Sequence, residues 1–151
     1  MASINELSTR FESSERPAGN ILDAQGILAQ AIAATNFYAG YAVLAANFDA
    51  QIAQLPALVP SVTSFVAGQT ITAPTDYSEI TEATNLTTSE WALIRPLFML
   101  YVERENAIQL EASRGMGVDV FGRSSSEVAG DIMQMELTLP HNAALSLAFS
   151  V

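Results

Sequence analysis

The side chains of this chain that could take part in catalysis are one histidine and a set of carboxylates. His141 follows Pro140 and is the single histidine of a sequence without cysteine. One imidazole without thiolates offers too few ligands for an ordinary transition-metal site. A serine–histidine–aspartate triad would need the same histidine as its base, and no nucleophile-elbow motif accompanies it. We therefore predict neither a metal site nor catalysis at His141.

Carboxylates gather in the C-terminal half, where two of them at a suitable separation could act as acid and base. The set comprises Glu103, Glu105, Glu111, Asp119, Glu127, Asp131 and Glu136. Their spacing selects no particular pair. The Gly115–Met116–Gly117 run is not a phosphate-binding loop, because such a loop needs a lysine and the sequence contains no lysine. We predict no catalytic residue and no cofactor, and keep a carboxylate-based enzyme as a less favoured alternative.

The composition is acidic and sparse in charge. The net charge is −10 at pH 7 with 15% charged residues, which argues against a nucleic-acid-binding surface because phosphate contacts need clustered cations. All six cations are arginine, a residue suited to two-pronged carboxylate contacts at interfaces. Compositional drift would also explain the absence of lysine.

Two observations bear on localisation. The first residues lack a cationic start followed by an apolar core, so no secretory signal is expected and the chain is predicted to be made inside the cell. No charge occurs from Gly26 to Phe48, a length that could cross a bilayer. Polar residues interrupt this run and much of it is alanine or glycine, so we predict a helix buried in a core or an oligomer instead.

The elements that hold the carboxylates are expected to be helices, and the longest should run from Leu86 to Gly117. Thr87 and Glu90 have the spacing of a capping box, and Leu86 and Trp91 that of a hydrophobic staple. Pro96 lies inside this helix and predicts a kink.

One charged residue interrupts the apolar stripe of the same helix. Glu105 falls on that stripe, with Arg104 beside it. One interpretation is a carboxylate at the edge of the core. The other is that Arg104 and Glu105 pair across an interface, where we also place Arg95.

A second long helix should follow and form a helical hairpin with the first. Ser124 and Glu127 have capping-box spacing. The apolar stripe that follows consists of Val128, Ile132, Met135 and Leu139. Pro140 is expected to end this helix.

The N-terminal half predicts a short helix and a longer one. Ser3 and Glu6 have capping-box spacing, and Ile4, Leu7 and Phe11 lie at helical spacing, so residues 1–16 form a candidate arm that docks on a neighbour. The alternative, expected for the isolated chain, is a frayed terminus. After a break at 17–19, an alanine-rich helix capped by Asn20 should extend to about residue 54. Gly26 and Gly40 weaken this helix, so two shorter helices are the alternative.

Extended structure is predicted at two places. Residues 57–75 are rich in β-branched side chains and predict a small hairpin or an extended loop. Strict alternation at the end of the chain predicts a C-terminal strand that could add to a neighbouring subunit, with one face formed by Leu145, Leu147, Phe149 and Val151. The expected fold is mainly α: a helical bundle with a long kinked central helix and a helical hairpin, plus these two extended segments. Residues 1–16 form the arm, 17–140 the helical domain and 141–151 the tail.

The run TTSEWALIRPLFMLYVERENAIQLEASRGMGVDVFGRSSSEVAGDIMQMELTLP resembles small tailed-bacteriophage neck proteins of the head–tail connector or adaptor type. The resemblance covers residues 76–140 and rests on helix-packing features. It implies a virion structural protein, made in the host cytoplasm. Such a protein forms a ring, typically of twelve copies, between the portal and a downstream neck or tail protein, and DNA passes through its lumen. The main alternative is a small intracellular helical binding or regulatory protein that forms a dimer.

Overall fold

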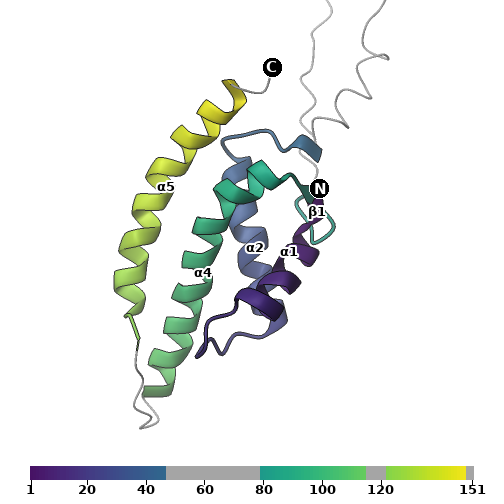
Figure 1. Cartoon of the computed structure of the whole chain (residues 1–151). Coiled ribbons are helices and arrows are strands. Elements are labelled where there is room, and N and C mark those ends of the chain that lie inside the picture. Colours follow the sequence, from purple (N-terminus) through teal and green to yellow (C-terminus); the bar gives the residue numbers. More distant parts are fainter. Residues whose placement is uncertain (47–78, 115–121, 149–151) are drawn as a thin grey trace, which may run out of the picture.

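The computed structural model describes residues 1–46, 79–114 and 122–148. Within these ranges the protein is mainly helical, so the predicted mainly-α fold class is confirmed (Figure 1). The helices are α1 (Ile4–Arg10), its direct π-helical continuation η1 (Phe11–Glu15), α2 (Ala24–Ala39), α4 (Thr88–Arg114) and α5 (Ser125–Ala148).

The central position in the bundle belongs to α4. It lies between α5 on one side and α2 on the other, and α1 packs against α2 (Figure 1). The antiparallel α4 and α5 form the predicted helical hairpin. One continuous core joins the helices, with Ile4 and Phe11 from the N-terminal segment, Ile27 from α2, Phe98 from α4 and Val128 from α5 all buried.

The start of α4 is set by its own sequence. The Thr87 backbone N–H donates to a Glu90 carboxylate oxygen at 2.7 Å, and the Glu90 N–H donates to the Thr87 hydroxyl at 3.2 Å, so the capping box is confirmed. The other Glu90 oxygen accepts the Ala45 N–H at 2.7 Å, which ties the segment after α2 to α4. Pro96 is exposed inside α4, which is one helix from Thr88 to Arg114.

A small sheet forms at a place that the sequence did not indicate. β1 (Ala2–Ser3) pairs antiparallel with β2 (Asn85–Leu86), with Ala2 opposite Leu86. The pairing continues into the start of α1, where the Ile4 N–H donates to the Thr84 carbonyl at 3.0 Å. The hairpin or loop predicted at 57–75 lies outside the described residues.

The prediction for the C-terminus is wrong over residues 145–148, which belong to α5 and not to a strand. The helix also continues through Pro140, which was expected to end it, and His141 lies on the helix. A proline inside a helix removes one backbone bond and costs about 3 kcal/mol. Burial of Leu139 and Ala143 on either side offsets that cost. Residues 149–151 of the predicted strand lie outside the described residues.

The start of α2 also differs from its prediction. Asp23 caps the helix, accepting the Gly26 N–H at 2.7 Å, whereas Asn20 accepts the Leu22 N–H at 2.9 Å in the preceding loop. The helix ends at Ala39, and residues 47–54 of its predicted extent lie outside the described residues. Among the helices of the described ranges, none has the length and apolar character that crossing a membrane requires.

Candidate functional site

The N-terminal residues predicted to contact a neighbour are used inside the chain. Ile4, Leu7 and Phe11 are 0%, 8% and 2% exposed. The Phe11 ring meets the Phe98 ring of α4 edge to face, with centroids 5.0 Å apart. The capping box that starts α1 is confirmed, since the Glu6 N–H donates to the Ser3 hydroxyl at 3.2 Å. In this conformation the segment therefore docks on its own bundle.

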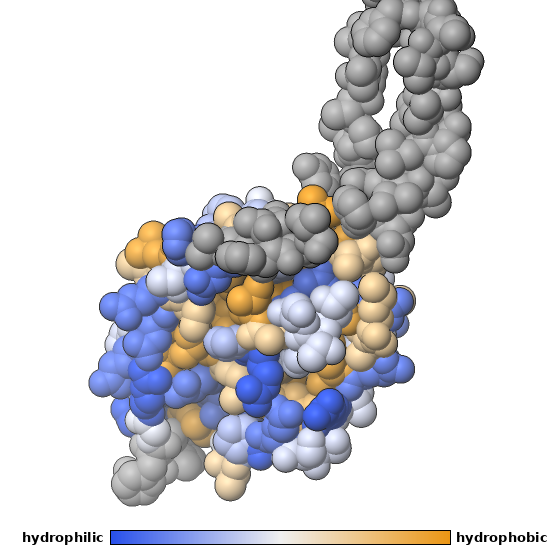
Figure 2. Space-filling model, turned by 45° about the horizontal axis from the view of Figure 1, so that its top comes forward, coloured by the Kyte–Doolittle hydropathy of each residue, from blue (hydrophilic) through white to orange (hydrophobic). Residues whose placement is uncertain are grey.

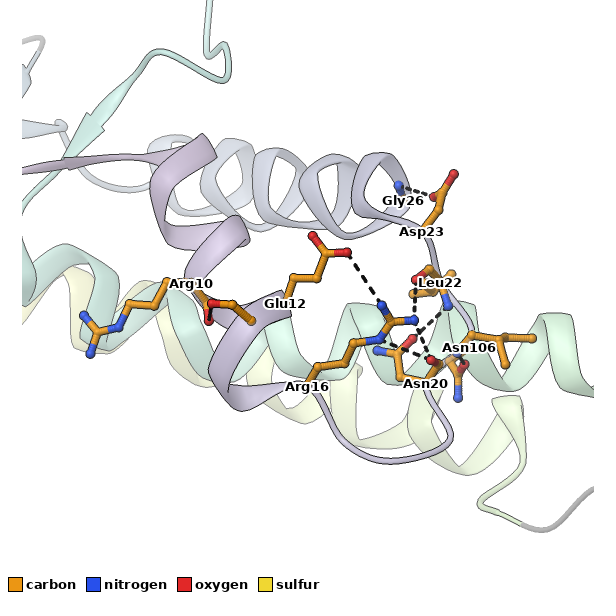
Figure 3. Close-up of polar contacts among 10 residues, drawn as sticks. Arg10, Glu12, Arg16, Asn20, Leu22, Asp23, Gly26 and Asn106 are labelled. Atoms are coloured by element: carbon orange, nitrogen blue, oxygen red, sulfur yellow. Dashed lines mark hydrogen bonds and ion pairs between the residues drawn. The ribbon is translucent and has the colours of Figure 1, made fainter.

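The loop between η1 and α2 is held by an arginine (Figure 3). Arg16 Nη2 donates to the carbonyls of Asn20 and Leu22 at 2.6 and 2.8 Å. Its Nη1 lies 3.7 Å from a Glu12 carboxylate oxygen. Arg10, by contrast, points away from this cluster (Figure 3).

A second contact ties the same loop to α4. Asn106 Oδ1 accepts the Ile21 N–H at 2.8 Å. Neither this residue nor Arg16 was singled out from the sequence. The sequence did contain a signal for the role of Arg16, which directly precedes a Pro–Ala–Gly turn. The carbonyl groups of such a turn have no partner in a helix, so they can accept hydrogen bonds from a nearby guanidinium. No local signal marked Asn106, whose partner is distant in the sequence.

The charged residues predicted at an interface divide into two kinds. Arg95 is paired within the chain, with its Nη2 2.7 Å from Glu15 Oε2. Arg104 is exposed and Glu105 half-buried, and the side chain of neither makes a hydrogen bond or ion pair within the described part of the chain. The side chains of Leu145 and Leu147, and all of Phe149 and Val151, lie outside the described residues.

Two of the candidate carboxylates hold the start of α5. Glu127 completes the predicted capping box, accepting the Ser124 N–H at 3.0 Å. Glu111 reaches over from α4 and accepts the Ser125 N–H at 2.7 Å and the Ser125 hydroxyl at 2.8 Å. These backbone and hydroxyl hydrogen bonds lower the pKa of both carboxyl groups. A general acid needs a raised pKa, so the two groups are shifted away from that role.

Two neighbouring carboxylates form ion pairs with one arginine. Arg123 pairs with Asp131 of α5 and, at 3.4 Å, with Glu103 of α4, so one guanidinium joins both arms of the hairpin. A small hollow of about 40 Å³ lies beside it, lined by Ala107, Leu110, Glu111, Arg114, Gly122, Arg123 and Ser124. Its volume accommodates only a few waters. The described residues contain no cluster of three or more metal-ligating side chains, and Asp119 lies outside them.

Further along the hairpin, a tyrosine joins α4 to α5. The Tyr101 hydroxyl donates to Glu136 Oε1 at 2.7 Å. Burial and the hydrogen bond to this carboxylate raise the pKa of Tyr101 above its ordinary value of 10. The phenol thus stays protonated at neutral pH and acts as a donor, not as a base.

These contacts orient α5 so that one side faces the bundle and the other faces solvent. Val128, Ile132, Leu139 and Ala143 are buried in the core. The opposite side, here called the outer face of α5, includes the exposed residues Gly130, Met133, Gln134, Leu137, His141 and Ala144. Met133 and Leu137 are 66% and 75% exposed, unusually high for large apolar side chains.

The outer face of α5 is our candidate functional site. Other large apolar side chains of the described residues are exposed in the segments before and after α2, on α4 and at the N-terminus. Figure 2 shows hydrophobic residues in separate patches among hydrophilic ones on the end of the bundle in view. The sequence offered a signal for the outer face, because Met133 and Leu137 fall outside the apolar stripe that packs on the bundle.

Comparisons of the chain with family models, with curated proteins and with solved structures find no match.

Proposed function

We propose that this protein is a structural protein without catalysis, which acts by assembling with copies of itself and with neighbouring proteins. The observation that carries the proposal is the contrast between its polar and apolar side chains. Most of the described candidate carboxylates cap helices or join them. Among the residues that the structure describes, seven large apolar side chains remain exposed: Met1, Ile21, Tyr41, Val43, Ile108, Met133 and Leu137. Exposed apolar groups gain free energy when a partner covers them.

The resemblance of residues 76–140 extends the proposal to a virion. We propose a head–tail connector or adaptor that forms a ring, typically of twelve copies, between the portal and the next neck or tail protein. A net charge of −10 suits a lumen through which DNA passes without being held, because like charges repel. Arg104, which has no ion-pair partner within the described residues, is available to a carboxylate of a neighbouring subunit.

The experiment that tests this proposal is native mass measurement over a range of concentrations, followed by electron microscopy of the largest species. A closed ring of many copies is the expected result, either for the protein alone or after addition of a portal protein. A protein that remains small at high concentration and with portal protein present would overturn the connector proposal.

A small helical binding or regulatory protein that works as a dimer is the second candidate. It is favoured by the exposure of Met133 and Leu137 on one side of α5, because a single partner could cover the outer face of α5. A compact dimer that resists further assembly in the same measurement would support it.

A further inference from the structure

We propose that residues 41–45, here called the strap, open without unfolding of the bundle, and that the Glu90 carboxylate is the latch that holds the strap closed. The strap leads away from the C-terminal end of α2 as a turn, a bend and irregular chain, and it reaches helical backbone again at Ala45. A short irregular segment is held by its buried side chains and by the hydrogen bonds at its ends. Those few contacts therefore decide whether it stays closed.

The apolar contact of the strap with the bundle comes from alternate side chains. Ala42 and Leu44 are 7% and 0% exposed and belong to the core, whereas Tyr41 and Val43 are 53% and 45% exposed. Leu44 is thus the one large apolar side chain that the strap buries. Because hydrophobic stabilisation scales with buried apolar area, withdrawing this side chain costs far less than unfolding the whole core.

The backbone hydrogen bonds of the strap lie at its two ends. The first two N–H groups donate to the Tyr38 carbonyl, both at 3.0 Å. The next two N–H groups donate to no acceptor within the described residues. The last N–H group, that of Ala45, donates to Glu90 Oε1 at 2.7 Å. This N–H thus ties the far end of the strap to α4 through one carboxylate oxygen.

Glu90 differs from the two other glutamates that complete capping boxes. Glu6 and Glu127 are exposed, and each accepts the backbone N–H of the cap residue of its own helix. Glu90 is 7% exposed, and its oxygens serve different segments: Oε2 accepts the N–H and hydroxyl of Thr87, and Oε1 accepts the Ala45 N–H. A carboxylate withdrawn from water requires such donors. The cap of α4 accounts for one oxygen, and the strap accounts for the other.

This division of the two oxygens allows the strap to open by itself. Opening breaks the hydrogen bond to Oε1 and withdraws Leu44, while Oε2 and Thr87 still cap α4. The rest of the core can therefore stay packed while the strap is open. The inference goes beyond the proposed function, because it concerns motion within one chain and holds whether or not the protein assembles.

Native-state hydrogen exchange of the unmodified protein tests the opening. The Ala45 amide should exchange at a rate that changes little with low concentrations of urea, because a local opening exposes little surface. The Phe98 amide, inside α4, should exchange faster as urea is added, because it requires a larger unfolding. The same urea dependence for both amides would mean that the strap opens only when the chain unfolds, and would overturn the proposal.

Two substitutions separate the latch from the cap of α4. Glu90→Ala removes both functions, whereas Thr87→Val removes the hydroxyl of the cap and leaves the carboxylate for the strap. Relative to the Phe98 amide, the Ala45 amide should exchange about tenfold or more faster in Glu90→Ala, and less than about threefold faster in Thr87→Val. Glu127→Ala removes the corresponding glutamate at α5 and should leave Ala45 unchanged. Equal acceleration in Glu90→Ala and Thr87→Val would overturn the role of Glu90.

Cysteine substitution gives a measurement that does not depend on the folding of Glu90→Ala. The chain has no cysteine, so Leu44→Cys and Leu97→Cys each introduce a single thiol, at positions that are both 0% exposed. A thiol reagent should modify Leu44→Cys about tenfold or more faster than Leu97→Cys, because opening of the strap exposes the first position and only a larger unfolding exposes the second. Equal rates of modification would overturn the opening.

Discussion

The N-terminal segment and α5 are both amphipathic helical regions at the edge of the bundle, yet they relate to it differently. In residues 1–16, the side chains of Ile4, Leu7 and Phe11 are buried in the core. The pairing of β1 with β2 and the hydrogen bonds of Arg16 to the loop before α2 hold this segment in place. α5 packs mainly on α4 and exposes Met133 and Leu137 on its other side. An apolar stripe alone therefore does not mark a docking surface. A docking surface also requires apolar side chains that remain after the chain's own core is complete.

The difference follows from what each segment can bury. α1 and η1 together span few residues, and their apolar side chains suffice for one face only, which the core takes. α5 is longer and has apolar or small residues on two opposite sides, one for α4 and one left in solvent. The predictions below test this contrast, from the largest expected effect to the smallest.

Replacing one large apolar side chain by alanine in each segment should give the largest difference in the free energy of unfolding between the two segments. Phe11→Ala removes a ring that is 2% exposed and packed on Phe98, so the free energy of unfolding should fall by about 3–5 kcal/mol. Leu137→Ala, at 75% exposure, should change it by less than about 1 kcal/mol in the monomer. Urea unfolding at low protein concentration measures both. Similar losses would contradict the contrast.

The clamp of the N-terminal loop should be the next largest contribution. Arg16→Met keeps most of the aliphatic stem but removes the donors to the Asn20 and Leu22 carbonyls, and should lower the free energy of unfolding by about 1–2 kcal/mol. Arg10→Met is the control, because the Arg10 side chain points away from the cluster (Figure 3). If the two variants unfold at the same urea concentration, the clamp does not stabilise the fold.

The tyrosine that joins α4 to α5 should contribute less. Tyr101→Phe removes a 2.7 Å hydrogen bond and leaves the half-buried Glu136 carboxylate without its donor, which should cost about 0.5–1.5 kcal/mol. Tyr41→Phe, at a tyrosine that is 53% exposed, should be near neutral. Thermal unfolding of the two variants under identical conditions compares them.

The smallest effect should appear only in acid. The pKa values of Glu111 and Glu127 are lowered from 4.5 in the folded protein. Both carboxylates therefore stabilise the fold above their unfolded pKa, and this contribution is lost as pH falls through the folded pKa. The midpoint temperature of thermal unfolding should fall as the pH decreases from 5 to 3, because the pKa of an ordinary glutamate side chain, about 4.3, lies in this range. The double variant Glu111→Gln, Glu127→Gln should show a shallower decline, and an equal slope would refute these roles.

Local signals in the sequence predicted the helix starts well. Three Ser/Thr-x-x-Glu patterns, at Ser3, Thr87 and Ser124, each form the capping box that their spacing indicates. A cap is a contact between a residue and backbone three positions away, so the sequence alone specifies both partners. The hairpin of α4 and α5 followed from two capped, apolar-striped segments joined by a short link.

Signals that depend on distant partners were misread or missed. Pro140 was expected to end a helix that continues to Ala148, because the burial of Leu139 and Ala143 is not visible in the local sequence. The alternating residues after Ala144 were read as a strand for the same reason. Asn20 gave way to Asp23 as the cap of α2, and Asn106 became visible only through its contact with Ile21.

By itself, the sequence determined the helical class and the positions of three capping boxes. Tertiary structure decided which apolar stripes are buried and which remain exposed. Caps and helical periodicity are short-range interactions encoded within a few residues. The burial of Phe11 and the exposure of Leu137 depend instead on which segments reach the core, and only the folded chain settles that competition.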